Sequence, residues 1–168
     1  MNIISFEDFL KEEIAILIDV RTPKEFLLEK IPNSVNIPVL LDEERVAVGT
    51  TYVQRSKESA KKMGIEFISK RLPEIFEQVQ ELSKKYSKLV FMCARGGMRS
   101  SSITSLFGSL GYKVAKLEGG YKAYRDFILN NLPIENEKFK YIVIHGRTGV
   151  GKTKILNKMI ELGVSVMD

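Results

Sequence analysis

The chain has 168 residues, of which 44% are hydrophobic and 28% charged, with a formal net charge of +5 and one cysteine. This length suits one domain with a substantial core, or a domain plus a fragment, and a single cysteine excludes both a disulfide framework and a multi-cysteine metal site. The sequence has neither an apolar run of the about 18–20 residues that span a membrane nor a signal peptide, so we expect a cytoplasmic protein whose basic excess permits a polyanionic partner such as RNA.

Apolar runs alternate with amphipathic stretches between residues 1 and 130. Ser5 and Thr22 are typical N-cap residues, and Pro23 suits the first position of a helix. The pattern predicts strands at 14–20, 34–38, 89–92 and 113–117, and helices after Ser5 and Thr22 and over 66–86, 99–110 and 121–130, with a bend or a new helix at Pro73. This alternation predicts an α/β fold with a parallel sheet and helices on both faces.

A second unit is predicted to follow residues 131–139, which are polar, rich in turn formers and typical of a linker. We expect a strand over 140–145, a helix over 152–162 and a strand over 164–167, the first βαβ of a P-loop NTPase-like domain. Three elements cannot enclose a core. The sequence therefore predicts a domain at 1–132 and an N-terminal fragment of a second domain at 138–168.

The cysteine lies in the sequence Cys-Ala-Arg-Gly-Gly-Met-Arg-Ser at 93–100, between a predicted strand and a predicted helix. A thiol attacks as a thiolate, which a helix N-terminus and nearby cations stabilise. Glycines let the loop turn its N–H groups inward, and Arg99 can hold an oxyanion through two hydrogen bonds. We predict Cys93 and Arg99 as catalytic residues in a site for attack on sulfur, selenium or phosphorus of a small anionic donor. The anion cradle comprises Arg95, Gly96, Gly97, Met98 and Ser100; the alternative is an inert, buried cysteine.

Four motifs in order resemble the rhodanese family, across residues 1–130. They are Asp19–Phe26, Lys30–Pro38, the cysteine loop and Leu117–Tyr124. Lys30 stands where the family often has histidine, and Asn33-Ser34 where it often has Gly-Ala. The resemblance implies that Asp19 and Arg21 support the loops through ion pairs. Arg99 follows Cys93 by six positions, where many rhodaneses have five, so the loop is similar to that of rhodanese-fold phosphatases and can admit a phosphorus-bearing donor.

A glycine-rich loop at 146–153, Gly-Arg-Thr-Gly-Val-Gly-Lys-Thr, fits the phosphate-binding pattern G-x-x-x-x-G-K-[ST] between a predicted strand and a predicted helix. Its N–H groups would bind phosphate, its lysine would reach the outer phosphates, and its threonine would ligate Mg²⁺. The predicted phosphate-binding residues are Gly146, Gly149, Gly151, Lys152 and Thr153. We read Asp168 as the first residue of a loop rather than as a second magnesium ligand, and we predict no other metal site.

The cysteine loop, Leu41–Arg45, Val48–Tyr52 and the order of the two units are similar to tRNA 2-selenouridine synthases. The resemblance implies replacement of sulfur in wobble 2-thiouridine of tRNA by selenium from selenophosphate, with Cys93 as nucleophile or chalcogen carrier. It also implies geranyl diphosphate or a nucleotide at the P-loop. The chain would be the N-terminal portion of such an enzyme or one subunit of a split form, with a separate chain carrying the rest of the P-loop domain.

Other functions stay open at this point. They are a generic rhodanese sulfurtransferase with a thiosulfate or persulfide donor, a phosphatase using Cys93 and Arg99, and a non-catalytic interaction module; no aspartate general acid for a phosphatase is evident near the loop. For isolated residues we favour structural roles: His145 as a strand-end residue, Tyr121 and Tyr124 as core, and the lysine groups at 57–62 and 84–85 as solvated helix faces rather than RNA contacts.

Overall fold

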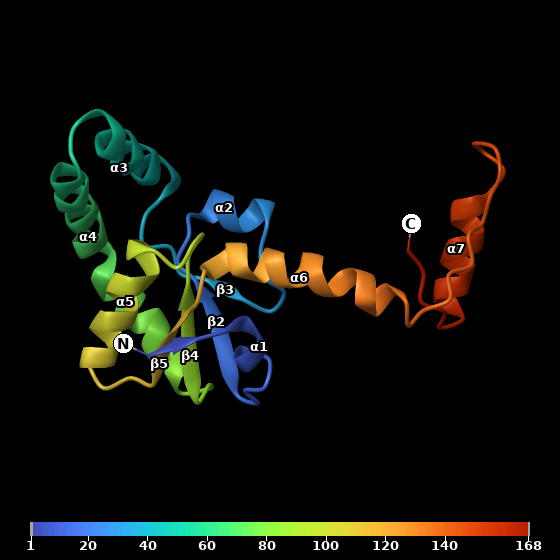
Figure 1. The fold of residues 1–168 in the computed structure, drawn as a ribbon, viewed down its shortest axis with the longest axis horizontal. Helices are drawn as coiled ribbons and strands as arrows, with labels where there is room; N and C mark the ends of the chain where they lie inside the picture. Colours follow the sequence, from blue (N-terminus) through green and yellow to red (C-terminus); the bar gives the residue numbers. More distant parts are fainter. Residues whose placement is uncertain (1, 168) are drawn as a thin grey trace. The chain divides into compact units, whose positions relative to one another are not determined.

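The computed structural model describes residues 2–167, and the chain divides into two compact units at Asn131 and Leu132. The strands are β1 (Ile3–Ile4), β2 (Ala15–Asp19), β3 (Val35–Asn36), β4 (Lys88–Met92) and β5 (Val114–Leu117). The helices are α1 (Phe6–Phe9), α2 (Pro23–Leu28), α3 (Asp42–Gln54), α4 (Lys57–Ser83), α5 (Met98–Ser109), α6 (Gly120–Asn136) and α7 (Lys152–Glu161). Figure 1 shows these elements in chain order.

The first unit is built on a five-stranded parallel sheet with the order β1-β5-β4-β2-β3. In the centre, Ile18 of β2 pairs with Phe91 of β4, which pairs in turn with Lys116 of β5. Because all the strands run the same way, their carboxyl ends lie at one edge of the sheet, where open α/β sheets place their sites. The predicted α/β fold is confirmed.

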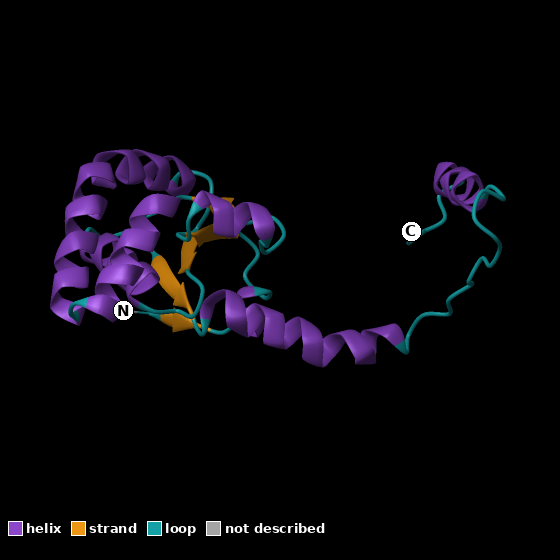
Figure 2. Ribbon diagram, turned by 90° about the horizontal axis from the view of Figure 1, so that it is seen from above, coloured by secondary structure: helices purple, strands orange, loops and turns teal. Residues whose placement is uncertain are grey.

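Successive residues of the central strands pack on opposite faces of the sheet. Ile16, Ile18, Leu89 and Phe91 belong to one core cluster, which α4 and α5 cover with Ile75, Val79, Ile103 and Phe107. Leu17, Val90, Met92, Ala115 and Leu117 belong to a second cluster on the other face, where Phe6 of α1 and residues of α6 pack. Figure 2 shows the strands enclosed between helices, and both faces are therefore covered, as predicted.

Local capping determines where the first two helices begin. The Ser5 hydroxyl accepts a hydrogen bond from the Asp8 N–H at 3.0 Å, and Thr22 forms a full capping box with Glu25 at the start of α2. Between α2 and β3, Asn33 has a φ of +61°. Asparagine tolerates this left-handed conformation better than most residues with a side chain do.

Two helices extend beyond their predicted bounds. The predicted helix over 66–86 is part of the 27-residue α4, which contains Pro73 in its interior, so the expectation that a new helix starts there is wrong. Pro73 cannot donate to the carbonyl of Ser69, but both residues are exposed and water can hydrogen-bond to that carbonyl. Similarly, α6 continues to Asn136 and includes much of the predicted linker over 131–139.

The predicted strands at 140–145 and 164–167 are absent from the structure, so the expected βαβ unit is reduced to the helix α7. A strand exists through hydrogen bonds to a neighbouring strand, and neither segment pairs with another within residues 2–167. The side chains of these segments are mostly exposed, including Ile142 at 87% and Val143 at 70%. Asp168 lies outside the described residues.

The helix α3 was not predicted, and it packs against α4. Its apolar residues follow no amphipathic pattern, so the sequence carried little signal for it. An acidic first turn and Glu44 define its start: the Glu44 carboxylate accepts from the Leu41 N–H at 2.7 Å and from both terminal nitrogens of Arg71 in α4, at 2.7 and 3.0 Å. No helix within residues 2–167 is long and apolar enough to cross a membrane.

Candidate active site

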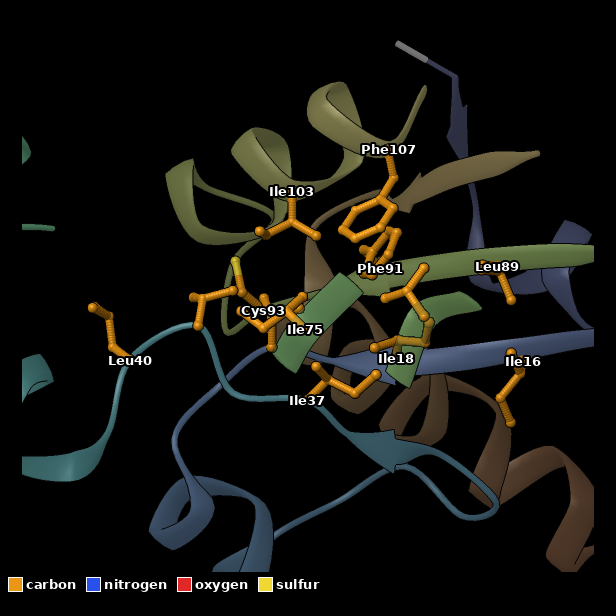
Figure 3. Packing of buried hydrophobic residues seen from close by; sticks show 13 residues of the cluster. Ile16, Ile18, Ile37, Leu40, Ile75, Leu89, Phe91, Cys93, Ile103 and Phe107 are labelled. Carbon is orange, nitrogen blue, oxygen red and sulfur yellow. The ribbon is translucent and has the colours of Figure 1, made fainter. Parts of the chain in front are cut away.

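The cysteine loop lies at the carboxyl edge of the sheet, directly between β4 and α5. Cys93 follows Met92, the last residue of β4, and is 3% exposed at the margin of the first core cluster. Figure 3 shows Cys93 among residues of this cluster that include Ile103 of α5 and Ile75 of α4. The strand thus holds the cysteine backbone rigidly, while the start of α5 directs its N–H groups toward the loop.

The sulfur of Cys93 lies beside one backbone donor and one hydroxyl group. The Gly97 N–H donates to Sγ at 3.2 Å, and the hydroxyl oxygen of the fully buried Ser100 lies 3.2 Å from Sγ. Gly97 is the N-cap of α5, and Ser100 is in the first turn of that helix. The hydroxyl can donate either to Sγ or to the Gly97 carbonyl, which lies 3.3 Å away. The Gly97 N–H is thus the donor that favours negative charge on the sulfur or on a chalcogen attached to it.

Contacts with the junction between β5 and α6 fix the shape of the loop. The N–H groups of Tyr121 and Lys122 donate to the carbonyls of Cys93 and Ala94, at 2.9 and 3.0 Å. Gly120 has a φ of +61°, and a Cβ atom there would lie 2.0 Å from the Cys93 carbonyl oxygen. The closing motif of the sequence therefore supports the cysteine loop through backbone contacts, and Gly120 has to be glycine for the two to approach so closely.

A lysine from β5 provides further hydrogen bonds to the cysteine loop. The ammonium of Lys116 donates to the Gly96 carbonyl at 3.1 Å and to the Ser101 hydroxyl at 3.2 Å. Gly96 itself has a φ of +62° and lies against the backbone of residues 117 and 119. Lys116 was not among the site residues predicted from the sequence. The available signal was a charged residue between Ala115 and Leu117 in an otherwise buried strand end.

The remaining cradle residues differ in exposure. Arg95, Gly97 and Met98 are exposed, Met98 to 59%. Arg99 is partly buried and is bound to Glu25 of α2: its two terminal nitrogens donate to Oε2 and Oε1 at 2.6 and 3.1 Å. Burial opposes the charge of Arg99, but the hydrogen bonds and charge of Glu25, with a contribution from Cys93, outweigh it and raise the pKa of the guanidinium.

A second pair between an arginine and a carboxylate lies at the end of β2. Arg21 donates to the carboxylate of Asp19 through Nε and a terminal nitrogen, with a shortest distance of 2.7 Å, and both residues are almost completely buried. Arg21 also donates to the Glu29 carbonyl at 2.6 Å and lies over the Tyr121 ring at 4.2 Å. Asp19 and Arg21 thus join the end of β2 to α2 and α6, and Tyr121 and Tyr124 pack against the core as expected.

The glycine-rich loop belongs to the second unit and is described separately. The α7 helix begins after Gly151, which has a φ of +93°, and Gly149 has a φ of +83°. The ammonium of Lys152 donates to the carbonyls of Gly146 and Arg147 at 2.8 and 2.9 Å, so the loop curls around it. His145 and Thr153 are exposed. Within residues 2–167, no group of three or more histidines, cysteines and acids is arranged to hold a metal ion.

The fold and the cysteine loop together define a rhodanese-like domain. The family model described as "Rhodanese-like domain" matches residues 5–127, and the chain belongs to this family. The N-terminal domain of a "putative ATP/GTP binding protein" from Clostridium difficile 630 is similar in structure, with a TM-score of 0.75 and 44% identity, covering 76% of this chain and 99% of that one.

Among curated proteins, the chain is similar to tRNA 2-selenouridine synthases. It is 38% identical over 144 residues to that of Nitrosomonas eutropha, covering 85% of this chain and 37% of the relative. It is 36% identical over 144 residues to that of Sulfurovum sp. strain NBC37-1, covering 85% of this chain and 40% of the relative. The family resemblance expected from the motifs is confirmed, and the chain spans about two fifths of the length of these relatives.

Proposed function

We propose that the chain is the rhodanese-like part of a tRNA 2-selenouridine synthase, a transferase that exchanges the sulfur of 2-thiouridine in tRNA for selenium. In the net reaction, selenium from selenophosphate bonds to C2 of the base, the C2–S bond breaks, and the phosphoryl group passes to water. The sulfur leaves as hydrogen sulfide, or as geranyl thiol if it has been geranylated. Support comes from the similarity to enzymes of that name along 85% of the chain. The observation that carries the proposal is the position of Cys93, whose sulfur meets the Gly97 N–H and the Ser100 hydroxyl at 3.2 Å.

In this proposal Cys93 is the nucleophile or chalcogen carrier, and the loop binds the oxygens of the donor. The N–H groups at the start of α5 supply donors that need no reorganisation, because β4 and the junction with α6 hold the loop. Arg99 lies at the same helix start and is the cation that would face a phosphoryl oxygen. tRNA is the partner that this reaction requires.

The P-loop is proposed to bind the phosphates of a nucleotide or of geranyl diphosphate, with Mg²⁺ at Thr153. Three of its residues fit such a group: Gly149 and Gly151 leave N–H groups free of side-chain cover, and the Lys152 ammonium lies on loop carbonyls that a phosphate can replace. The geranyl group would make sulfur a better leaving group. We further propose that the rest of the P-loop domain, on the same or a separate chain, covers the exposed apolar residues around α7.

A generic sulfurtransferase is the second candidate, because the family model is that of rhodanese-like domains in general. Here the Cys93 thiolate attacks the outer sulfur of thiosulfate, the S–S bond breaks, and sulfite leaves with a persulfide on the enzyme. The phosphatase alternative has less support. The acids beside the loop, Asp19 and Glu25, are both paired with arginines, so neither carboxyl group is free to serve as the proton donor.

The proposal is tested by introducing Cys93→Ser into the organism that makes the protein and measuring 2-selenouridine in its tRNA by mass spectrometry. This assay works whether one chain or two carry the complete enzyme. We expect 2-selenouridine to disappear and 2-thiouridine to accumulate. Undiminished 2-selenouridine in the variant would exclude the role of Cys93, and its absence from the parent strain would exclude the function.

A further inference from the structure

The Glu25 carboxylate is held in position by the capping box at the start of α2. It is the third residue of α2, and its Oε2 accepts from the Thr22 N–H at 3.0 Å, while its own N–H donates to the Thr22 hydroxyl at 3.3 Å. This reciprocal capping box fixes the carboxylate at the N-terminus of α2, where the helix dipole favours a negative charge. Glu25 therefore presents a preorganised anion to the neighbouring cysteine loop.

Arg99 donates two of its five N–H groups to this carboxylate. Burial raises the pKa of Glu25, but the hydrogen bond from Arg99, the Thr22 N–H and the charges of Arg99 and Arg21 outweigh it, so the net pKa is lowered and the carboxylate stays ionised near neutral pH. The cation that would bind a donor oxyanion is thus already bound to an internal one.

The other charged groups near the loop do not replace Arg99. Arg21 is committed to Asp19 on the end of β2, and Lys116 of β5 lies on the Gly96 carbonyl and the Ser101 hydroxyl. Arg95 is exposed, so water screens its charge more than that of the partly buried Arg99. An oxyanion that enters the cradle therefore has to draw Arg99 away from Glu25, or share it against the repulsion of the carboxylate.

Glu25 has room to move if it releases Arg99. A cavity of about 550 Å³ lies between α2 and α3, and Glu25 is among its lining residues. The other charged residues of the lining are two cations, Lys24 and Arg45, and two acids, Asp42 and Glu43. The end of the carboxylate can therefore turn out of the pair without entering the protein core. Arg45, which lines the same cavity, offers a second cation toward which it can turn.

We propose that Glu25 is a specificity-determining residue, an internal carboxylate that competes with the donor oxyanion for Arg99. Oxyanions such as phosphate or sulfate, which gain only the contacts of the cradle, bind weakly because each must displace Glu25. A donor that also places its chalcogen on the Cys93 sulfur gains an additional contact and overcomes this competition. The inference rests on the proposed role of Arg99 as the residue that binds the donor oxyanion.

The single cysteine makes the test direct, since a chain labelled with [¹³Cβ]cysteine gives one resonance, that of Cys93. The wild type, Glu25→Gln and Glu44→Gln are each titrated with inorganic phosphate while this resonance is followed. Glutamine retains an oxygen that can cap the Thr22 N–H but lacks the charge. Glu44 is a matched control: at a different helix start it also accepts from the N–H of the N-cap residue, Leu41, and from both terminal nitrogens of an arginine.

We expect Glu25→Gln to bind phosphate about tenfold more tightly than the wild type, the factor that corresponds to about 1.4 kcal/mol, and Glu44→Gln to bind it as the wild type does. The gain should vanish in Glu25→Gln combined with Arg99→Ala, because it acts through Arg99. A gain that persists in the Arg99→Ala background would reflect charge alone and would overturn the proposal.

Two further outcomes separate this proposal from the one on which it rests. If Arg99→Ala weakens phosphate binding but Glu25→Gln leaves it unchanged, Glu25 does not compete, and the role of Arg99 stands. If Arg99→Ala leaves the affinity unchanged, Arg99 does not bind the oxyanion, and both proposals fail. Should Glu25→Gln not fold, Glu25→Asp serves instead, because its shorter side chain cannot keep both the cap and the arginine pair; unchanged phosphate affinity in that variant would equally overturn the competition.

Discussion

Replacing Gly120 by alanine should disrupt the cysteine loop from outside it. The new Cβ atom would lie 2.0 Å from the Cys93 carbonyl oxygen and 2.6 Å from the Gly96 nitrogen, and these are backbone atoms that cannot rotate away. The φ of +61° adds about 1–2 kcal/mol for any residue with a Cβ, and overpacking typically adds about 1–3 kcal/mol. We therefore expect Gly120→Ala to lower the free energy of unfolding by about 2–5 kcal/mol.

Gly111→Ala provides the matched control. Gly111 has a φ of +87°, but a Cβ atom there would meet nothing within 4 Å, so this variant isolates the backbone strain. Urea denaturation followed by circular dichroism gives both free energies of unfolding, and the [¹³Cβ]Cys93 resonance reports the loop. The larger loss in Gly120→Ala, together with a shifted Cys93 resonance, is the expected result. Equal losses of unfolding free energy in the two variants, with an unchanged resonance, would refute the role of Gly120 in holding the cysteine loop.

Three further predictions follow from ion pairs and loop contacts. Asp19→Asn leaves Arg21 buried without its carboxylate and should lower the free energy of unfolding by about 3–5 kcal/mol in urea denaturation; a loss below about 1 kcal/mol would contradict the supporting role of the pair. The hydrogen bond from Arg71 keeps the pKa of Glu44 below its ordinary 4.5 although burial opposes this, so the pair stabilises the fold above about pH 4.5 and its contribution is lost as the pH falls through the lowered value. Glu44→Gln should accordingly cost about 1 kcal/mol at neutral pH and little near pH 3, and an equal cost at both would argue against the ion pair. Lys116→Met removes the ammonium that holds the loop. It should slow the formation of the selenophosphate adduct on Cys93 about tenfold, as measured by mass spectrometry. An unchanged rate would show that the loop keeps its shape without this ammonium.

Four of the five strands and most helices of the first unit were predicted because each is encoded locally, whereas the two-residue edge strand β1 was missed. The apolar runs of β2 and β4 are buried on both faces, and the caps at Ser5 and Thr22 are formed by neighbouring residues. The α3 helix was missed because its stability depends on contacts with α4 and on a pair between residues 27 positions apart, Glu44 and Arg71.

The candidate site was predictable in its composition but not in its pairings. The sequence placed Cys93 and Arg99 in one loop, yet nothing local indicated that Glu25, 74 positions away from Arg99, would hold its guanidinium. The predictions of strands at 140–145 and 164–167 were wrong for the opposite reason. Their sequences favour strands, but a strand requires a partner, and none lies beside them within the described residues.

The most direct test of the central claim is intact mass spectrometry of the chain after incubation with selenophosphate, with thiosulfate in parallel, each compared with Cys93→Ser. The account predicts one of two adducts from selenophosphate on wild-type Cys93 and none on the variant. Attack on selenium breaks the Se–P bond, adds selenium and releases phosphite, whereas attack on phosphorus adds the phosphoryl group and releases selenide. An adduct from thiosulfate alone would contradict the account and identify a generic sulfurtransferase domain. Equal labelling of Cys93→Ser would show that Cys93 is not the residue that meets the donor.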